Sequence, residues 1–138
     1  MKYDYTRESP LSYTSKITRK PRIEVEFFGK EKSVKVFSIV DSGADITLIN
    51  EEIAQFLDID LKGLPLFKTL GITGNSSDVR IGKIKIKLPG YSKVSEIKAQ
   101  FLIGKGNFDV LLGQDDFFDK HRIKFERDHF VFEITPVK

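Results

Sequence analysis

The chain has 138 residues, of which 40% are hydrophobic and 31% are charged, as expected for one globular domain with a single core. Its 23 lysines and arginines nearly balance its 20 acidic residues, so the net charge of +3 favours a mixed surface over a basic face for nucleic acid. The absence of cysteine excludes disulfide bonds, thiol catalysis and cysteine-ligated zinc.

The N-terminal segment, residues 1–21, is polar and basic and ends at Arg19-Lys20-Pro21. We expect it to form a flexible arm or an edge segment, with the folded domain covering residues 22–138. The segment lacks the apolar stretch of a secretory signal, and no apolar run in the chain has the length of a membrane span. The sequence therefore predicts a soluble, cytoplasmic protein with no membrane partner.

The first half of the domain shows the period-two alternation of half-buried strands. Asn50 can cap a short helix in which Ile53, Phe56 and Leu57 share one face. The strands predicted here are residues 23–27, 34–40 and 46–49.

The second half continues the strand pattern. Residues 68–88 predict a hairpin whose tip at residues 73–77 contains a glycine. Further strands are expected at residues 94–103 and 108–112, then one or two helical turns at 114–120 and a last hairpin over 123–134. The fold class predicted is all-β with one or two short helices.

The informative motif is Val40-Asp41-Ser42-Gly43-Ala44-Asp45, in which a carboxylate follows directly after an apolar strand. A carboxylate at such a place needs hydrogen-bond partners, because an unpaired charge in a low-dielectric environment is costly. Ser42 can supply a hydrogen bond, and Gly43 lets the backbone approach closely. Taken alone, an Asp-Ser-Gly triplet is also compatible with an ordinary turn.

The surrounding sequence resembles retropepsins, the single-domain relatives of pepsin. Residues 36–49 resemble their active-site region: an apolar strand, Asp-Thr/Ser-Gly-Ala/Ser, a polar residue and a second apolar run. Residues 108–115, Phe-Asp-Val-Leu-Leu-Gly-Gln-Asp, resemble the second hallmark of the family, an apolar pair and a glycine before a short helix. The continuation to Ile134 is similar to proteases of gypsy-type retrotransposons and related cellular domains. The resemblance implies a retropepsin-like barrel.

The resemblance also implies roles for individual residues. Asp41 matches the catalytic carboxylate, and Ser42 and Gly43 match the residues that support it, with the Ser42 hydroxyl tying two active-site loops together. Around them, residues from the motif, the hairpin tip and the second hallmark match substrate-binding positions. They are Ala44, Asp45, Ile72, Thr73, Gly74, Asn75 and Leu112, of which Ile72 to Asn75 form a flap that closes over a peptide.

Catalysis in this family needs two aspartates that share one proton, so that one acts as a base toward water. The chain has one such motif and is too short for two lobes, so the second aspartate must come from another copy of the chain across a two-fold axis. We therefore expect a homodimeric aspartic endopeptidase that cleaves peptides or unfolded segments and needs no cofactor or metal.

Other features have structural interpretations. His121 and His129 are expected at the surface rather than as zinc ligands. Asp115, Asp116 and Asp119 are expected to stabilise a helix N-terminus rather than to bind a metal. Two alternatives to the protease remain open: a dimerisation or interaction module of the same fold with weak activity, and a small nucleic-acid-binding β-domain.

Overall fold

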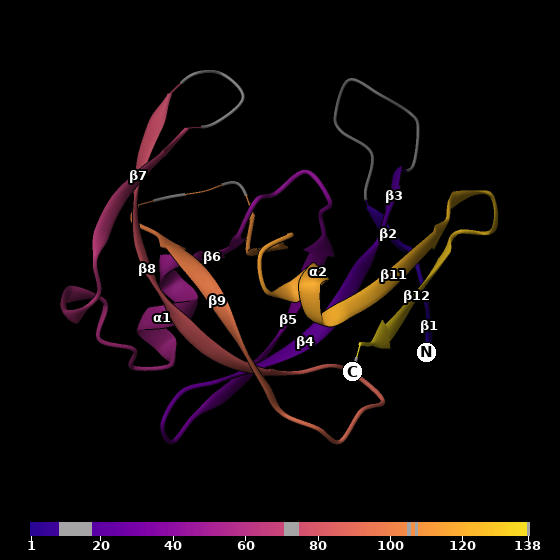
Figure 1. The fold of residues 1–138 in the computed structure, drawn as a ribbon, viewed down its shortest axis with the longest axis horizontal. Helices are drawn as coiled ribbons and strands as arrows, with labels where there is room; N and C mark the ends of the chain where they lie inside the picture. The colour runs from indigo at the N-terminus through magenta and orange to yellow at the C-terminus, as the bar shows by residue number, and fades with distance from the viewer. Residues whose placement is uncertain (9–17, 71–74, 105, 107, 138) are drawn as a thin grey trace.

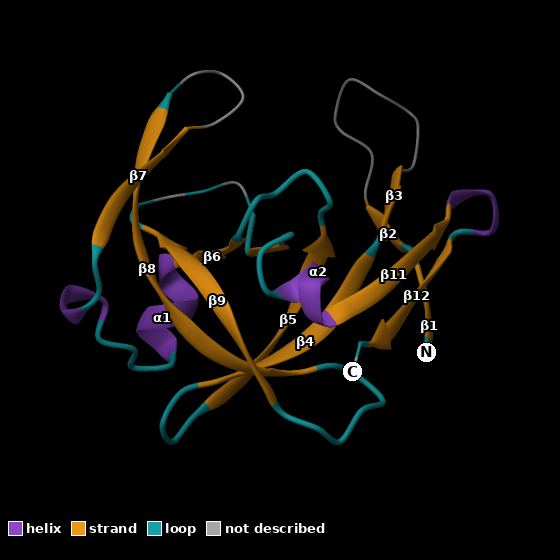
Figure 2. Cartoon of the chain, in the orientation of Figure 1, coloured by secondary structure: helices purple, strands orange, loops and turns teal. Residues whose placement is uncertain are grey.

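The computed structural model describes residues 1–8, 18–70, 75–104, 106 and 108–137 (Figure 1). Strands and loops make up most of the described chain, with two short α-helices (Figure 2). The strands are β1 (Lys2–Asp4), β2 (Thr6–Glu8), β3 (Thr18–Lys20), β4 (Arg22–Phe28), β5 (Ser33–Val40), β6 (Thr47–Asn50), β7 (Leu66–Leu70), β8 (Ser76–Lys87), β9 (Ser95–Leu102), β10 (Val110–Leu112), β11 (His121–Glu126) and β12 (Val131–Pro136). The helices are α1 (Glu51–Phe56) and α2 (Phe117–Lys120), with 3-10 turns η1 (Leu61–Gly63) and η2 (Arg127–His129).

The main sheet closes into a barrel. Its strand order is β4-β5-β10-β6-β9-β8-β7, and β4 also pairs with β8. Strands β4, β5, β10, β6, β9 and β8 therefore form a ring, which β7 extends as a partner of β8 alone. Most pairings are antiparallel, but β10 is parallel to β5 and β6 is parallel to β9. Closure leaves few exposed strand edges, which limits pairing with other chains.

The alternation in the sequence decides which side chains fill the barrel. In β4, Ile23, Val25 and Phe27 are buried, while the residues between them face outward. Phe27 pairs in register with Ile86 of β8, and both side chains are fully buried. Residues of β6, β9 and β12 contribute equally buried side chains, so one continuous core lies inside the barrel and extends beneath the C-terminal hairpin.

A second sheet, β1-β12-β11, packs beside the barrel, and β2 pairs with β3 in a two-stranded sheet. Tyr3 of β1 packs against Phe132 of β12 with ring centroids 5.6 Å apart. Residues 1–21, expected to form a flexible arm or an edge segment, are described only at 1–8 and 18–21. The described parts of this segment are strands, with β1 at an edge of its sheet. The domain boundary at residue 21 stays a prediction.

Helix α1 begins as the sequence predicts, because the Asn50 side chain accepts a hydrogen bond from the Glu52 backbone at 3.1 Å. Its buried face differs from the predicted one. Ala54 and Leu57 are buried, whereas Phe56 is 52% exposed and lies against the Lys32 ammonium. Neither helix of the described chain is long and apolar enough to cross a membrane.

The surface position predicted for His121 is wrong. β11 starts directly after α2, so its first residue faces the interior, and His121 is only 8% exposed. Its ring lies 4.5 Å from the ring of Phe117, and Nδ1 is 2.8 Å from the Phe117 carbonyl oxygen. Burial lowers the pKa of the imidazole, and the nearby Lys120 ammonium adds to this effect. His129 is largely exposed, as predicted.

Candidate active site

Asp41 lies at the point where β5 ends and the chain turns toward β6. Val40 before it is buried, while Asp41 itself is half-buried. Its backbone N–H donates to the Leu112 carbonyl at 3.0 Å, and its own carbonyl accepts from the Ala44 N–H at 3.2 Å. The Asp41 carboxylate accepts a hydrogen bond from the Gly43 N–H at 2.9 Å. The carboxylate is therefore oriented by its own loop and still reaches solvent.

The residues predicted around Asp41 lie in this loop. Ser42, Gly43 and Asp45 are exposed and Ala44 is half-buried. A side chain at position 43 would begin only 3.3 Å from Asp41 Oδ1, so glycine fits this close turn best.

The second sequence landmark passes directly beside the first. β10 lies between β5 and β6, and the chain after it binds the Asp41 loop through consecutive backbone groups. Gln114 N–H donates to the Ala44 carbonyl at 2.8 Å, and Asp115 N–H donates to the Asp45 carbonyl at 2.7 Å. Together these bonds fix the loop against the end of the barrel.

Gly113 allows the chain after β10 to pass this close to the Asp41 loop. A Cβ at this position would lie 2.6 Å from the Ile46 carbonyl carbon and 2.8 Å from the Ala44 carbonyl oxygen. Both contacts are with backbone, which cannot move aside alone. The Gly113 N–H donates to the hydroxyl of buried Thr47 at 3.1 Å. The glycine of the second hallmark is thus a packing requirement of the site.

An apolar row lies next to Asp41 on the face of the sheet opposite the core. Leu111 pairs in register with Ile39 of β5 and with Leu48 of β6, and residues paired in this way point to the same face. All three are half-buried. Leu112, which the sequence placed among the substrate-binding residues, is fully buried in the core and contributes its backbone carbonyl instead. Leu111 is the residue of this pair that faces outward from the core.

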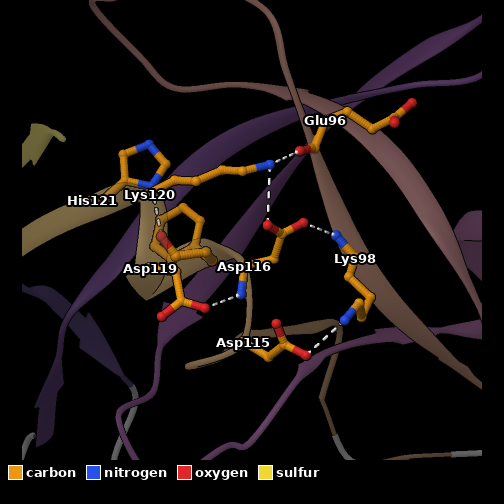
Figure 3. Close-up of polar contacts among 8 residues, drawn as sticks. Glu96, Lys98, Asp115, Asp116, Asp119, Lys120 and His121 are labelled. Carbon is orange, nitrogen blue, oxygen red and sulfur yellow. Dashed lines mark hydrogen bonds and ion pairs between the residues drawn. The ribbon is translucent and has the colours of Figure 1, made fainter. Parts of the chain in front are cut away.

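Behind the loop, acidic residues of the α2 region bind lysines (Figure 3). The Lys98 ammonium lies 2.9 Å from the Asp115 carboxylate. Asp116 accepts from the Lys98 backbone N–H at 2.6 Å and forms an ion pair with Lys120 at 3.1 Å. Burial by itself raises the pKa of the Asp116 carboxyl, but these two donors outweigh it, so the pKa lies below its ordinary value. These bonds tie α2 to β9.

The carboxylates near α2 thus have roles in the protein structure. The Asp116 N–H also bonds to the Asp119 carboxylate at 3.0 Å, which closes a capping box at the helix start. In the part of the chain that the structure describes, no group of three or more histidines and carboxylates is arranged to hold a metal ion.

The predicted flap is only partly described. Ile72, Thr73 and Gly74 lie outside the described residues, and Asn75 is exposed directly before β8. The strands that carry this segment, β7 and β8, pair in register from Leu66–Arg80 to Leu70–Ser76. In Figure 1 this hairpin rises at the same end of the molecule as the loop between β5 and β6.

The sequence reasoning missed Ile39, Leu48, Thr47 and Gln114. The first two lie within strands that the sequence predicts, at residues 34–40 and 46–49, where they alternate with buried Val40 and Ile49. No local signal marks Thr47 or Gln114. The Gln114 amide nitrogen donates to the Ser42 carbonyl at 2.7 Å, across 72 positions of sequence.

Comparisons with known proteins bear on the family and the fold of the chain. A family model described as aspartyl protease matches residues 23–115. The fold is similar to that of a retropepsin-like aspartic protease from Rickettsia conorii, with 19% identity, a TM-score of 0.58, and coverage of 83% of this chain and 89% of the other. It is also similar to the retroviral protease-like domain of Ddi1 from Leishmania major, with 16% identity, a TM-score of 0.53, and coverage of 84% and 90%. No curated protein sequence matched. The prediction of an all-β, retropepsin-like fold with one or two short helices is confirmed: the fold is mostly β, with two short helices in the described chain.

Proposed function

The chain belongs to the aspartyl protease family, and from this premise we propose that it is an endopeptidase whose catalytic carboxylate is Asp41. One observation carries the proposal. Asp41 follows buried Val40 at the end of β5, its carboxylate is oriented by the Gly43 N–H, and it keeps access to solvent beside an apolar row. A reacting water and a peptide need that combination of order and access.

The second carboxylate of the dyad is Asp41 of another copy of the chain. The sequence contains a single Asp-Ser-Gly motif. Other carboxylates of the α2 region, those of Asp115 and Asp116, are bound to lysines and therefore do not serve as a second catalytic acid. A two-fold axis beside the loop brings the two Asp41 side chains together, and Ser42 lies next to the same axis.

The two carboxylates share one proton, because two like charges at short range cannot both stay ionised. The ionised carboxylate takes a proton from a water molecule as the water oxygen attacks the peptide carbonyl carbon. The protonated carboxyl gives its proton to the carbonyl oxygen. When the tetrahedral intermediate collapses, the carboxyl that took the water proton gives it to the peptide nitrogen, and the other carboxylate takes a proton from a hydroxyl of the intermediate. The C–N bond breaks, a carboxyl and an amino terminus leave, and the two carboxylates again share one proton.

The substrate is an extended peptide or an unfolded segment of protein. The row of Ile39, Leu48 and Leu111 supports apolar side chains on either side of the scissile bond. It offers half-buried apolar surface on strands that pair side by side, and Ile39 stands two positions before Asp41. The β7–β8 hairpin closes over the bound peptide and excludes water from the site.

The test is cleavage of a peptide library from acidic to neutral pH by the parent and by Asp41→Asn. We expect the variant to lose cleavage and to keep its fold and its mass in solution, which for the dimer is about twice 15.8 kDa. Asp58→Asn is the matched control, because Asp58 is exposed, lies far from the loop in sequence, and has a positive φ of 57° that asparagine tolerates. Full activity in Asp41→Asn contradicts the proposal.

Subunit mixing tests the shared site. When equal amounts of parent and Asp41→Asn exchange subunits, about half of the parent subunits pair with an inactive one, so activity falls to about half of that of the same amount of parent alone. An enzyme that acts as a monomer keeps its full activity in the mixture.

A further inference from the structure

We propose that Gln114 is a positioning residue that orients Asp41 through a single peptide group, an inference that rests on the proposed function. The Gln114 side-chain amide donates to the Ser42 carbonyl oxygen at 2.7 Å. The Gly43 N–H donates to Asp41 Oδ1 at 2.9 Å. The Ser42 carbonyl and the Gly43 N–H belong to the same peptide unit, so the two hydrogen bonds lie at opposite ends of one group.

A peptide unit is planar and rigid, so fixing its carbonyl also fixes the direction of its N–H. Without the Gln114 contact, the Ser42–Gly43 unit can rotate about its flanking bonds, and Gly43 offers little resistance to such rotation. Hydrogen bonds in series also polarise one another, and the Gln114 amide therefore strengthens the bond from Gly43 to the carboxylate. Gln114 thus controls the orientation of Asp41 without touching it.

The position of Gln114 is well determined by its surroundings. Its backbone N–H donates to the Ala44 carbonyl at 2.8 Å, so main chain and side chain hold the loop on both sides of Gly43. A carbonyl oxygen only accepts hydrogen bonds, which means that the amide nitrogen of Gln114, and not its oxygen, faces Ser42.

Gln114 is exposed, and water competes for its hydrogen bond. Its removal therefore changes global stability little, because exposed polar contacts add little to folding. Its effect on kcat is larger, because catalysis depends on the orientation of one carboxylate within a fraction of an ångström. This difference separates a positioning role from a structural one.

The deciding variant is Gln114→Glu, which keeps the shape of the side chain and makes its donor depend on pH. Below the ordinary glutamate pKa of about 4.3, the protonated carboxyl can donate to the Ser42 carbonyl. Above it, the carboxylate repels that oxygen. We expect the ratio of variant to parent kcat to be near one at acidic pH and to fall about tenfold toward neutral pH, with KM nearly unchanged.

Two controls accompany this variant. Gln55→Glu makes the same charge change at an exposed position on α1 and should leave the ratio flat with pH. Gln114→Ala lacks the donor at every pH and should lower kcat by the same factor throughout. A flat ratio for Gln114→Glu overturns the proposal.

A measurement without substrate separates this inference from the proposed function. Absence of cleavage by the parent at any pH contradicts the peptidase, and exchange of the Gly43 amide hydrogen with solvent then tests Gln114 alone. We expect faster exchange in Gln114→Glu than in the parent at neutral pH, with the difference vanishing under acidic conditions. Equal exchange in the two proteins at neutral pH refutes the control of the loop by Gln114.

Discussion

Replacing Gly113 by alanine tests the contact between the two landmarks. The added Cβ would lie 2.6 Å from the Ile46 carbonyl carbon and 2.8 Å from the oxygens of Ala44 and Ile46, whereas ordinary contacts begin at 3.4 Å. β10 and the Asp41 loop must therefore separate by about 0.6–0.8 Å to accept it. Such a shift stretches the 2.8 Å bond between the Gln114 N–H and the Ala44 carbonyl to about 3.5 Å, the limit of a hydrogen bond.

Overpacking of this kind costs about 1–3 kcal/mol, and the loosened hydrogen bond costs about 1 kcal/mol more. We expect Gly113→Ala to lower the free energy of unfolding by about 3 kcal/mol, a large part of the about 5–15 kcal/mol of a typical domain. Urea unfolding at equal protein concentration measures the change. We also expect proteolysis to weaken, because the same shift moves the loop that carries Asp41.

Gly63→Ala is the matched control. Its Cβ would meet only the end of the Asp60 side chain, at 3.3 Å, and that carboxylate can turn away. The control should stay within about 0.5 kcal/mol of the parent. If Gly113→Ala unfolds at the same urea concentration as the control, the close packing described for Gly113 is wrong.

Two further variants test buried groups. Thr47→Val removes the acceptor of the Gly113 N–H and should cost about 1–3 kcal/mol in urea unfolding. Thr135→Val, at an exposed position of β12, should cost less than about 0.5 kcal/mol, and equal costs for the two variants would contradict the role of Thr47. His121→Gln tests pH dependence. Burial lowers the pKa of His121 in the folded protein, so the unfolded chain binds a proton first as the pH falls. The neutral ring therefore contributes its full stability above about pH 6.5, the ordinary histidine pKa, and this contribution is lost as the pH falls below that value. The free energy of unfolding of the parent should therefore fall more steeply on acidification than that of His121→Gln. The exposed-site variant His129→Gln should follow the parent. Parallel curves of unfolding free energy against pH for the parent and His121→Gln would contradict this reasoning.

Local sequence patterns predict many of the secondary-structure elements of this protein and both landmarks of its site. Period-two alternation marks β4 and most of the other strands of the barrel, because the alternation itself decides which side chains can be buried. Asn50 marks the start of α1 through a hydrogen bond that spans two residues. The two landmarks, residues 36–49 and 108–115, are also visible in the chain, and both contribute residues to the site.

Other features depend on which segments meet. The sequence gives no sign that β10 lies between β5 and β6, parallel to one and antiparallel to the other. That arrangement decides that Leu111 faces outward from the core and Leu112 inward. Likewise, His121 is buried because β11 starts against α2, and no pattern around this histidine indicates that contact.

The sequence by itself predicted most strands of the barrel and the helix α1 from neighbours within a few positions. Its resemblance to retropepsins predicted the fold and pointed to Asp41 as the candidate catalytic residue. Only the tertiary structure decided how the site is held, as the bond from Gln114 to Ser42 illustrates. Its partners stand 72 positions apart, and the closed strand order of the barrel brings them within hydrogen-bonding distance. Such a contact exists only once the sheet is assembled, because the local sequence of neither segment predicts it.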